Sequence, residues 1–194
     1  MKKVFPWLTA LLILASCNSG NPNEPRVRIE TGVGDIELAL FPQKAPKTVA
    51  AFLALVDSGY YDNASFYRVL KNDNVPAEYN TGLIQGGIFE SNYKASATTR
   101  RIEHESPRQT GLSHLSGTVS MARTTAGSAS SEFFICIGDQ QQFDSSSRGN
   151  SDGLGYAAFG MVKSGMDVVQ KIQNKKSNGE HFVTPIRIIS VKRL

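Results

Sequence analysis

The chain has 194 residues, 40% of them hydrophobic and 20% charged, so a single soluble globular domain is the default expectation. Basic residues outnumber acidic ones by 21 to 17 and are scattered along the chain, which argues against a nucleic-acid-binding protein. Two cysteines, Cys17 and Cys136, exclude a disulfide framework.

The first residues have the pattern of a targeting segment. Lys2 and Lys3 precede a short apolar run at 7–14, which is too short to span a membrane as a stable helix. Small residues then lead to Cys17, and this arrangement resembles the lipobox of bacterial lipoproteins, in which the cysteine becomes the acylated first residue. We therefore expect a lipoprotein signal peptide over 1–16. An ordinary signal peptide with an incidental cysteine is the alternative.

A lipid on Cys17 would place the protein outside the cytoplasm, held to a membrane by its acyl chains. Residues 18–25 are polar with two prolines and are expected to form a flexible tether. Asn18 does not resemble the aspartate that retains some lipoproteins at the inner membrane, which slightly favours the outer membrane on its periplasmic side.

The first elements of the domain, which we expect over 26–194, are a hairpin and a helix. Residues 26–30 and 36–40 alternate apolar and polar side chains around a glycine-rich turn, which predicts two paired strands. Residues 48–56 carry apolar side chains at i, i+3, i+4 and i+7, the spacing of an amphipathic helix that Gly59 would close.

The rest of the domain alternates short apolar runs with polar loops. The longest polar segments between these runs are an insert at 71–81 and a loop at 138–155. A second helix is predicted at 166–172. The other predicted strands are 66–70, 83–89, 118–123, 132–137, 157–162 and 183–191. Many short strands with one early and one late helix predict a closed antiparallel sheet with two helices packed outside it.

Five fragments on these runs carry the chemical signal. They hold arginine, glutamine, small alanine and several aromatic side chains, in the order Phe66-Tyr67-Arg68, Leu83-Ile84-Gln85-Gly86-Gly87, Ser120-Met121-Ala122-Arg123, Ser131-Glu132-Phe133-Phe134-Ile135 and Tyr156-Ala157-Ala158-Phe159-Gly160. Together they describe a cationic donor beside an apolar pocket, without a nucleophile or a metal cluster. Such a site suits the rearrangement of a bound chain better than its cleavage.

In order and spacing, these fragments resemble the cyclophilin family of peptidyl-prolyl cis-trans isomerases, from about residue 26 to residue 194. The resemblance implies a mainly β fold, a closed eight-stranded antiparallel β-barrel with two flanking α-helices. It implies an enzyme that accelerates rotation of X-Pro bonds in proline-containing polypeptides and so assists protein folding, and the leader implies that these are extracytoplasmic proteins. It implies neither cofactor nor metal, and we expect a monomer that does not bind nucleic acid.

The resemblance also assigns residues. Arg68 matches the family's catalytic arginine, and Gln85 matches the glutamine that orients the arginine and the substrate carbonyl. Substrate-binding positions are matched by Leu83, Ala122, Phe134, Phe143 and Tyr156. Taken singly, Arg68 could be a solvated strand residue and Phe134 an ordinary core residue.

One pocket wall is left without a residue. In the simplest alignment the family's second pocket phenylalanine falls on Gly82, while the insert before it leaves Tyr79 or Leu83 as possible substitutes. A pocket without that wall favours an alternative function, a chaperone or protein-binding module with weak or no isomerase activity. The pairing of Arg68 with Gln85 disfavours that alternative.

Two other features have plainer interpretations. His104 lies between Glu103 and Glu105, which predicts a solvated charged cluster, and the three histidines lack metal-ligand spacing. Cys136 lies in an apolar strand and is expected to be a buried, inert thiol.

Overall fold

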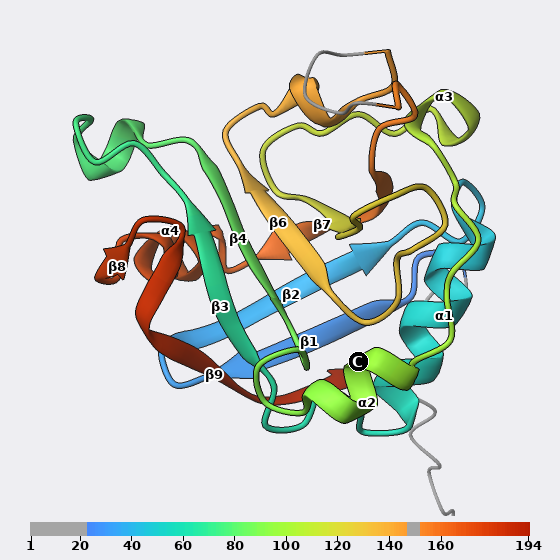
Figure 1. Cartoon of the computed structure of the whole chain (residues 1–194), viewed down its shortest axis with the longest axis horizontal. Helices are drawn as coiled ribbons and strands as arrows, with labels where there is room; N and C mark the ends of the chain where they lie inside the picture. The colour runs from blue at the N-terminus through green and yellow to red at the C-terminus, as the bar shows by residue number, and fades with distance from the viewer. Residues whose placement is uncertain (1–22, 147–151) are drawn as a thin grey trace, which may run out of the picture.

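The computed structural model describes residues 23–146 and 152–194 (Figure 1). The predicted signal peptide 1–16 and the predicted lipidation site Cys17 therefore lie outside the described residues, as does most of the tether.

Eight strands form a closed antiparallel barrel (Figure 1). Their order around the ring is β1-β2-β7-β5-β6-β4-β3-β9, and pairing of β1 with β9 closes it. The strands are β1 (Arg26–Thr31), β2 (Gly34–Leu40), β3 (Ser65–Leu70), β4 (Gly82–Gly87), β5 (Thr118–Met121), β6 (Phe133–Ile137), β7 (Ala157–Ser164) and β9 (His181–Arg193). A two-residue strand, β8 (Ser177–Asn178), pairs with β9 as a small hairpin on the outside. The predicted eight-stranded barrel is thus confirmed.

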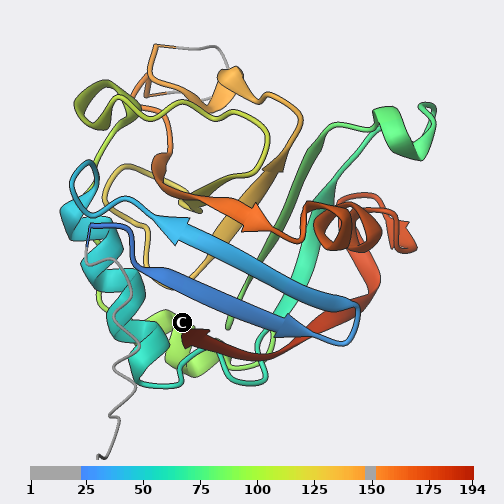
Figure 2. The same ribbon diagram turned by 180° about the vertical axis from the view of Figure 1, so that it is seen from behind.

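Both predicted helices are present, and they lie at opposite ends of the barrel (Figures 1 and 2). Helix α1 (Pro46–Asp57) packs near β7 and β9, and α4 (Met166–Gln173) packs near β2, β4 and β6. On α1 the residues at the predicted spacing, Val49, Phe52, Leu53 and Val56, are all buried, and Thr48 is buried with them. The hydrophobic effect on this face holds the helix in place.

Residues 23–146 and 152–194 contain two more α-helices, which were not predicted. These are α2 (Tyr93–Thr98) and α3 (Pro107–Thr110), together with the 3₁₀ turns η1 (Ala77–Tyr79) and η2 (Gln141–Phe143). Each is too short to show a 3.6-residue period, so a periodicity argument passes over it. Their caps were the available signal, since Asn92 caps α2 and a capping box of Ser106 with Gln109 opens α3.

Aromatic rings fill the barrel interior. Phe52 from α1 lies 4.9 Å from Phe159 of β7, and Phe66 of β3 lies 5.8 Å from Phe133 of β6, measured between ring centroids. Tyr61 is also fully buried there and donates a hydrogen bond to the Ser131 carbonyl. Because inward side chains alternate with outward ones along each strand, the opposite face of the same strands remains available for a site.

The predicted solvated cluster at 103–105 is wrong for two of its three residues. Glu103 is exposed, but His104 is half-buried, and desolvation lowers the pKa of its imidazole. Glu105 is buried at the start of α1, where its carboxylate accepts hydrogen bonds from the Lys47 and Thr48 amides at 3.1 and 2.7 Å. The N-cap residue of α1 is an alanine without a capping side chain, so a glutamate from a distant loop replaces it.

None of the helices within residues 23–146 and 152–194 has the length and apolar character needed to cross a membrane.

Replacing Glu105 with alanine tests this distant cap. We expect Glu105→Ala to lower the free energy of unfolding by about 2 kcal/mol, because it leaves buried amide donors without a partner. The matched control is Glu103→Ala, which removes an exposed carboxylate and should change that free energy by less than about 0.5 kcal/mol. Urea denaturation measures both, and equal losses would contradict the role of Glu105.

Candidate active site

A β-bulge in β3 shapes the site. Phe66 lies opposite Gly86 of β4, and Arg68 lies opposite Gln85, so Tyr67 is an extra residue without a partner. An inserted residue reverses the alternation of side chains beyond it. Pairing of β3 with β9 shifts register at the same place.

The consequence appears in the burial of the strand. Phe66 and Val69 belong to the barrel core, although they are three residues apart. Leu70 instead packs against a separate apolar cluster outside the barrel, and Arg68 is about one third exposed. Strict alternation would have put Arg68 on the same face as Phe66, inside the barrel. The bulge turns the cation outward.

Arg68 and Gln85 meet directly on this outer face. NH1 of the guanidinium donates to Gln85 Oε1 at 2.9 Å, and Gln85 Nε2 donates to the Tyr67 hydroxyl at 2.9 Å. Hydrogen bonds at both ends of the Gln85 side-chain amide fix its orientation. Its carbonyl oxygen therefore accepts from Arg68 in one defined direction. Burial raises the pKa of Tyr67, which keeps that hydroxyl protonated.

Beside this pair lies an apolar cluster on the outer face of β4 and β6. Leu83, Phe134 and Cys136 are its buried members, with Leu70, Ala122, Phe143 and Tyr156 packed around them. The rings of Phe134, Phe143 and Tyr156 stand 5.4 to 5.5 Å apart, each pair steeply inclined. Edge-to-face packing of this kind makes a firm apolar wall. Burial raises the pKa of the Cys136 thiol, in agreement with the inert cysteine expected.

Behind Phe134, a buried histidine supports the cluster. The His114 ring is stacked on Phe134 with 5.9 Å between centroids, and its two nitrogens lie 2.6 Å from Asp144 Oδ1 and 3.1 Å from Ser120 Oγ. Desolvation lowers its pKa, although Asp144 acts in the opposite direction. The imidazole is therefore neutral at pH 7, so the ring that supports the apolar wall is uncharged.

Arg123 holds Tyr156, one of the partly buried rings of the cluster. Its guanidinium lies 5.1 Å from the Tyr156 centroid and donates to both carboxylate oxygens of Asp152, at 2.6 and 2.8 Å, and to the Gly155 carbonyl. These bonds lower the pKa of Asp152 to about 2. A cation that is neutralised on one side and stacked on a ring on the other acts as a brace for the loop before β7.

All seven residues assigned by resemblance border one cavity of about 620 Å³. They are Arg68, Gln85, Leu83, Ala122, Phe134, Phe143 and Tyr156. Within residues 23–146 and 152–194, no group of three histidine, cysteine or acidic side chains is placed to hold a metal ion.

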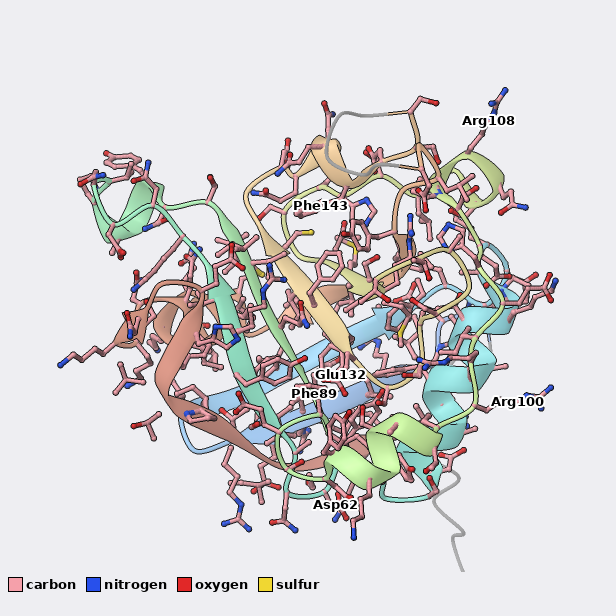
Figure 3. All side chains as sticks on the ribbon, in the orientation of Figure 1. Asp62, Phe89, Arg100, Arg108, Glu132 and Phe143 are labelled. Carbon is pink, nitrogen blue, oxygen red and sulfur yellow. The ribbon has the colours of Figure 1, made fainter. Side chains whose placement is uncertain are left out.

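The cavity extends along β6 to a more polar part. Figure 3 places Phe143 near one end of this strand and Glu132 with Phe89 near the other. The Glu132 carboxylate accepts from the Ile88 and Phe89 amides at 3.0 and 3.1 Å, and burial raises its pKa. An extended peptide lying along this strand would therefore meet the apolar cluster at one end and polar groups at the other.

The missing wall is supplied by Leu70, a residue that the family resemblance does not assign. Gly82 has a φ of +138°, and a Cβ there would lie 2.0 Å from the Leu70 carbonyl oxygen, so this position holds no side chain. Tyr79 is 71% exposed on the insert and does not border the cavity. Leu83 does border it, and its partner across the strands, Leu70, completes the wall.

Around Arg68, the residues Tyr67, Leu70 and Glu180 were not predicted as parts of the site. Leu70 lies two positions after Arg68, so strand alternation alone places both on one face. Tyr67 could not be found in this way because the bulge is not visible in the sequence. Glu180 contacts Arg68 across 112 residues of chain, which no local pattern reveals.

Comparisons with known proteins agree with this geometry. Residues 26–193 match the model of the family described as "Cyclophilin type peptidyl-prolyl cis-trans isomerase/CLD". A peptidyl-prolyl cis-trans isomerase of Acinetobacter baylyi is 37% identical over 99% of this chain and 95% of its own. Peptidyl-prolyl cis-trans isomerase B of Escherichia coli is 40% identical over 76% and 83%. A cyclophilin-type isomerase of Cryptosporidium parvum, solved in the presence of the dipeptide Ala-Pro, has a TM-score of 0.68 and 26% identity, covering 86% of this chain and 97% of its own.

A substitution at Gly82 tests whether this position is backbone-only. We expect Gly82→Ala to lower the free energy of unfolding by about 3 kcal/mol or more, because the added Cβ meets the Leu70 carbonyl and the backbone conformation is one that only glycine adopts easily. Gly32→Ala is the control, since a Cβ at Gly32 meets no atom within 4 Å. Chemical denaturation measures the free energy of unfolding of both variants. A Gly82→Ala protein as stable as wild type would contradict this description of the wall.

Proposed function

This chain belongs to the cyclophilin-type peptidyl-prolyl cis-trans isomerases, and we propose that the cluster around Phe134 seats a substrate proline while Arg68 promotes rotation of the bond before it. The supporting observation is the 2.9 Å hydrogen bond from Arg68 to Gln85 at the edge of that cluster. A cation held at a fixed place beside a proline-sized apolar surface is what this reaction needs.

The barrier to be lowered is a loss of resonance. Partial double-bond character of the peptide bond gives a rotational barrier of about 18–20 kcal/mol. Uncatalysed exchange at proline therefore takes roughly tens to hundreds of seconds. No covalent bond has to be made or broken, so the enzyme needs only to bind the twisted state more tightly than the planar one.

The residues divide this work. Phe134, with its ring neighbours and the Leu70–Leu83 wall, holds the proline ring and excludes water. A guanidinium N–H of Arg68 donates to the prolyl nitrogen, whose lone pair becomes available only as the bond twists and resonance is lost. That hydrogen bond exists in the transition state and not in the planar ground state, and each 1.4 kcal/mol of the difference is worth about tenfold in rate.

Gln85 has an orienting role in this proposal. Its oxygen receives Arg68 NH1 and its nitrogen is held by Tyr67, so the amide keeps the guanidinium directed at the cluster. The wall beside it is aliphatic, because Leu70 and Leu83 form it and Gly82, where the family resemblance would give a phenylalanine, carries no side chain. Weaker packing against the proline ring should appear as a raised KM rather than a lost kcat.

We propose further that the enzyme works outside the cytoplasm as a membrane-anchored lipoprotein, with the outer membrane slightly favoured. The support is the sequence alone: a basic start, a short apolar run and the Leu14-Ala15-Ser16-Cys17 segment. Several acyl chains on Cys17 would anchor it firmly, since each buried methylene contributes about 0.8 kcal/mol. Its substrates would then be proline-containing polypeptides exported across the inner membrane.

Arg68 variants test the reaction. We expect Arg68→Ala to lower kcat/KM on a proline peptide by roughly 10²- to 10³-fold, the usual cost of removing one transition-state donor. Arg68→Lys should also lose most of the activity, because an ammonium lacks the planar fork that both Gln85 and the substrate require. A protease-free isomerisation assay measures kcat/KM for the wild type and for both variants.

The control is Arg28→Ala, which removes an exposed arginine from β1 on a strand that carries no residue of the cavity. It should keep full activity. Wild-type protein that does not accelerate isomerisation would favour the binding-module alternative, and a fully active Arg68→Ala protein would contradict the role of Arg68.

Cys17 is tested by fractionation. Expressed in a Gram-negative bacterium, the full chain should take up labelled fatty acid and sediment with outer membranes, whereas Cys17→Ser should do neither. Cys136→Ser is the matched control and should behave as wild type, because that thiol is buried in the domain. Unlabelled wild-type protein in the soluble periplasmic fraction would contradict the anchor and favour an ordinary signal peptide.

A further inference from the structure

Glu180 stands at the tip of the hairpin formed by β8 and β9. Asn178 pairs with His181, which leaves Gly179 and Glu180 as a two-residue loop. Gly179 has a φ of +56°, as the first loop residue of a tight hairpin of the II′ type requires. The backbone of Glu180 is thus fixed within a short, well-defined turn.

That turn is joined to the active strand. The Val69 amide donates to the Glu180 carbonyl at 2.8 Å, and Arg68 lies opposite His181 in the pairing of β3 with β9. Main-chain bonds therefore place Glu180 directly beside Arg68. The position of the carboxylate does not depend on the long arginine side chain reaching out to find it.

The carboxylate holds the side of the guanidinium that Gln85 leaves free. Glu180 Oε2 accepts from Nε at 3.0 Å and from NH2 at 2.6 Å, while NH1 donates to Gln85. Of the five guanidinium N–H groups, three are engaged in these bonds. The remaining two, one on NH1 and one on NH2, are the donors left to meet a substrate.

We propose that Glu180 is a positioning residue, which together with Gln85 fixes the plane of the Arg68 guanidinium so that these two donors face the proline. The proposal rests on the catalytic role proposed for Arg68. With Gln85 as its sole anchor, the guanidinium could pivot about one hydrogen bond. Two anchors on different edges remove that freedom, and displacements of about 1 Å are known to cost up to 100-fold in rate.

The carboxylate also offsets part of the arginine's charge, which acts in the opposite direction. Side-chain exposure decides between the two effects: Arg68 is 32% exposed and Glu180 56%. Water and salt screen charges strongly at such exposure, so the electrostatic effect is small and the pair adds little stability. Screening does not weaken the second effect, which is the positioning of the Arg68 guanidinium. Loss of Glu180 should therefore slow the enzyme without unfolding it.

The experiment compares Glu180→Ala and Glu180→Gln with wild type in the isomerisation assay. We expect the alanine variant to lose roughly 5- to 20-fold in kcat with KM unchanged, because the affected donors act in the transition state. Glutamine keeps an acceptor oxygen, so Glu180→Gln should retain at least about a third of the wild-type kcat. Both should unfold at the wild-type temperature.

Glu37→Ala is the matched control. Glu37 accepts from Arg26 NH1 at 3.1 Å on the β1–β2 side of the barrel, so the control breaks a similar pair away from the cavity. It should leave kcat and KM unchanged. A kcat of Glu180→Ala within twofold of wild type, or an increase in both Glu180 variants, would overturn the proposal.

Two further measurements separate this proposal from the role of Arg68 itself. In an Arg68→Ala background, Glu180→Ala should cause no further loss, since Glu180 acts through Arg68. The Arg68 Nε–H signal in NMR spectra should exchange with water faster in Glu180→Ala than in wild type, and unchanged exchange would overturn the proposed clamp whatever the activity. If Arg68→Ala retains full activity, the catalytic role of Arg68 fails, whereas a dead Arg68→Ala with an unaffected Glu180→Ala refutes the positioning role alone.

Discussion

One extra residue in strand β3 determines where the chemistry of this protein can occur. Because Tyr67 has no partner on β4, Phe66 and Val69 both enter the barrel while Arg68 and Leu70 both leave it. A closed barrel has a filled interior and no free edges, so its outer face is where a substrate can bind. The bulge sends the cation there, next to its partner Gln85.

The outer face of β4 and β6 then supplies the pocket by plain alternation. Along β6, Phe133 and Ile135 point into the core, whereas Phe134 and Cys136 point into the outer cluster. Every inward side chain that stabilises the barrel also fixes the direction of its outward neighbour. The rigidity of the core is thus passed to the pocket, and the orientation of Phe134 does not depend on a bound ligand.

Polar groups hold this apolar pocket from behind and from the side. His114, kept neutral by burial, supports Phe134, and Arg123 braces Tyr156 with its charge matched by Asp152. Each group carries out its task without placing an unbalanced charge against the proposed proline site. Arg68, by contrast, keeps two N–H groups outside its bonds to Gln85 and Glu180, and the proposed mechanism requires such donors.

The sequence was a good guide to this structure wherever a period or an ordered motif carried the information. Strand alternation and the helical spacing from Val49 to Val56 predicted the barrel and α1, and the motif order singled out seven residues that all border one cavity. It failed where geometry depends on contacts distant in the chain. The bulge at Tyr67 looks like ordinary strand sequence, Glu105 looks like one charge in a solvated run, and Glu180 reaches Arg68 through a hairpin 112 residues away. Gly82 looked like a lost wall because the substitute, Leu70, lies on the neighbouring strand.

Exchange NMR on a proline-containing peptide with a small amount of protein tests the central claim most directly, because it observes the isomerisation and the pocket in one sample. The account predicts cis–trans exchange cross-peaks that are absent without protein, together with shifts of the Leu70 and Leu83 methyl signals and unchanged signals from Leu38 and Leu40, which are fully buried in the barrel core. Exchange cross-peaks without any change at Leu70 and Leu83 would mean that the proline binds elsewhere. A peptide that shifts those methyl signals without faster exchange would mean that the pocket binds proline but does not catalyse its isomerisation.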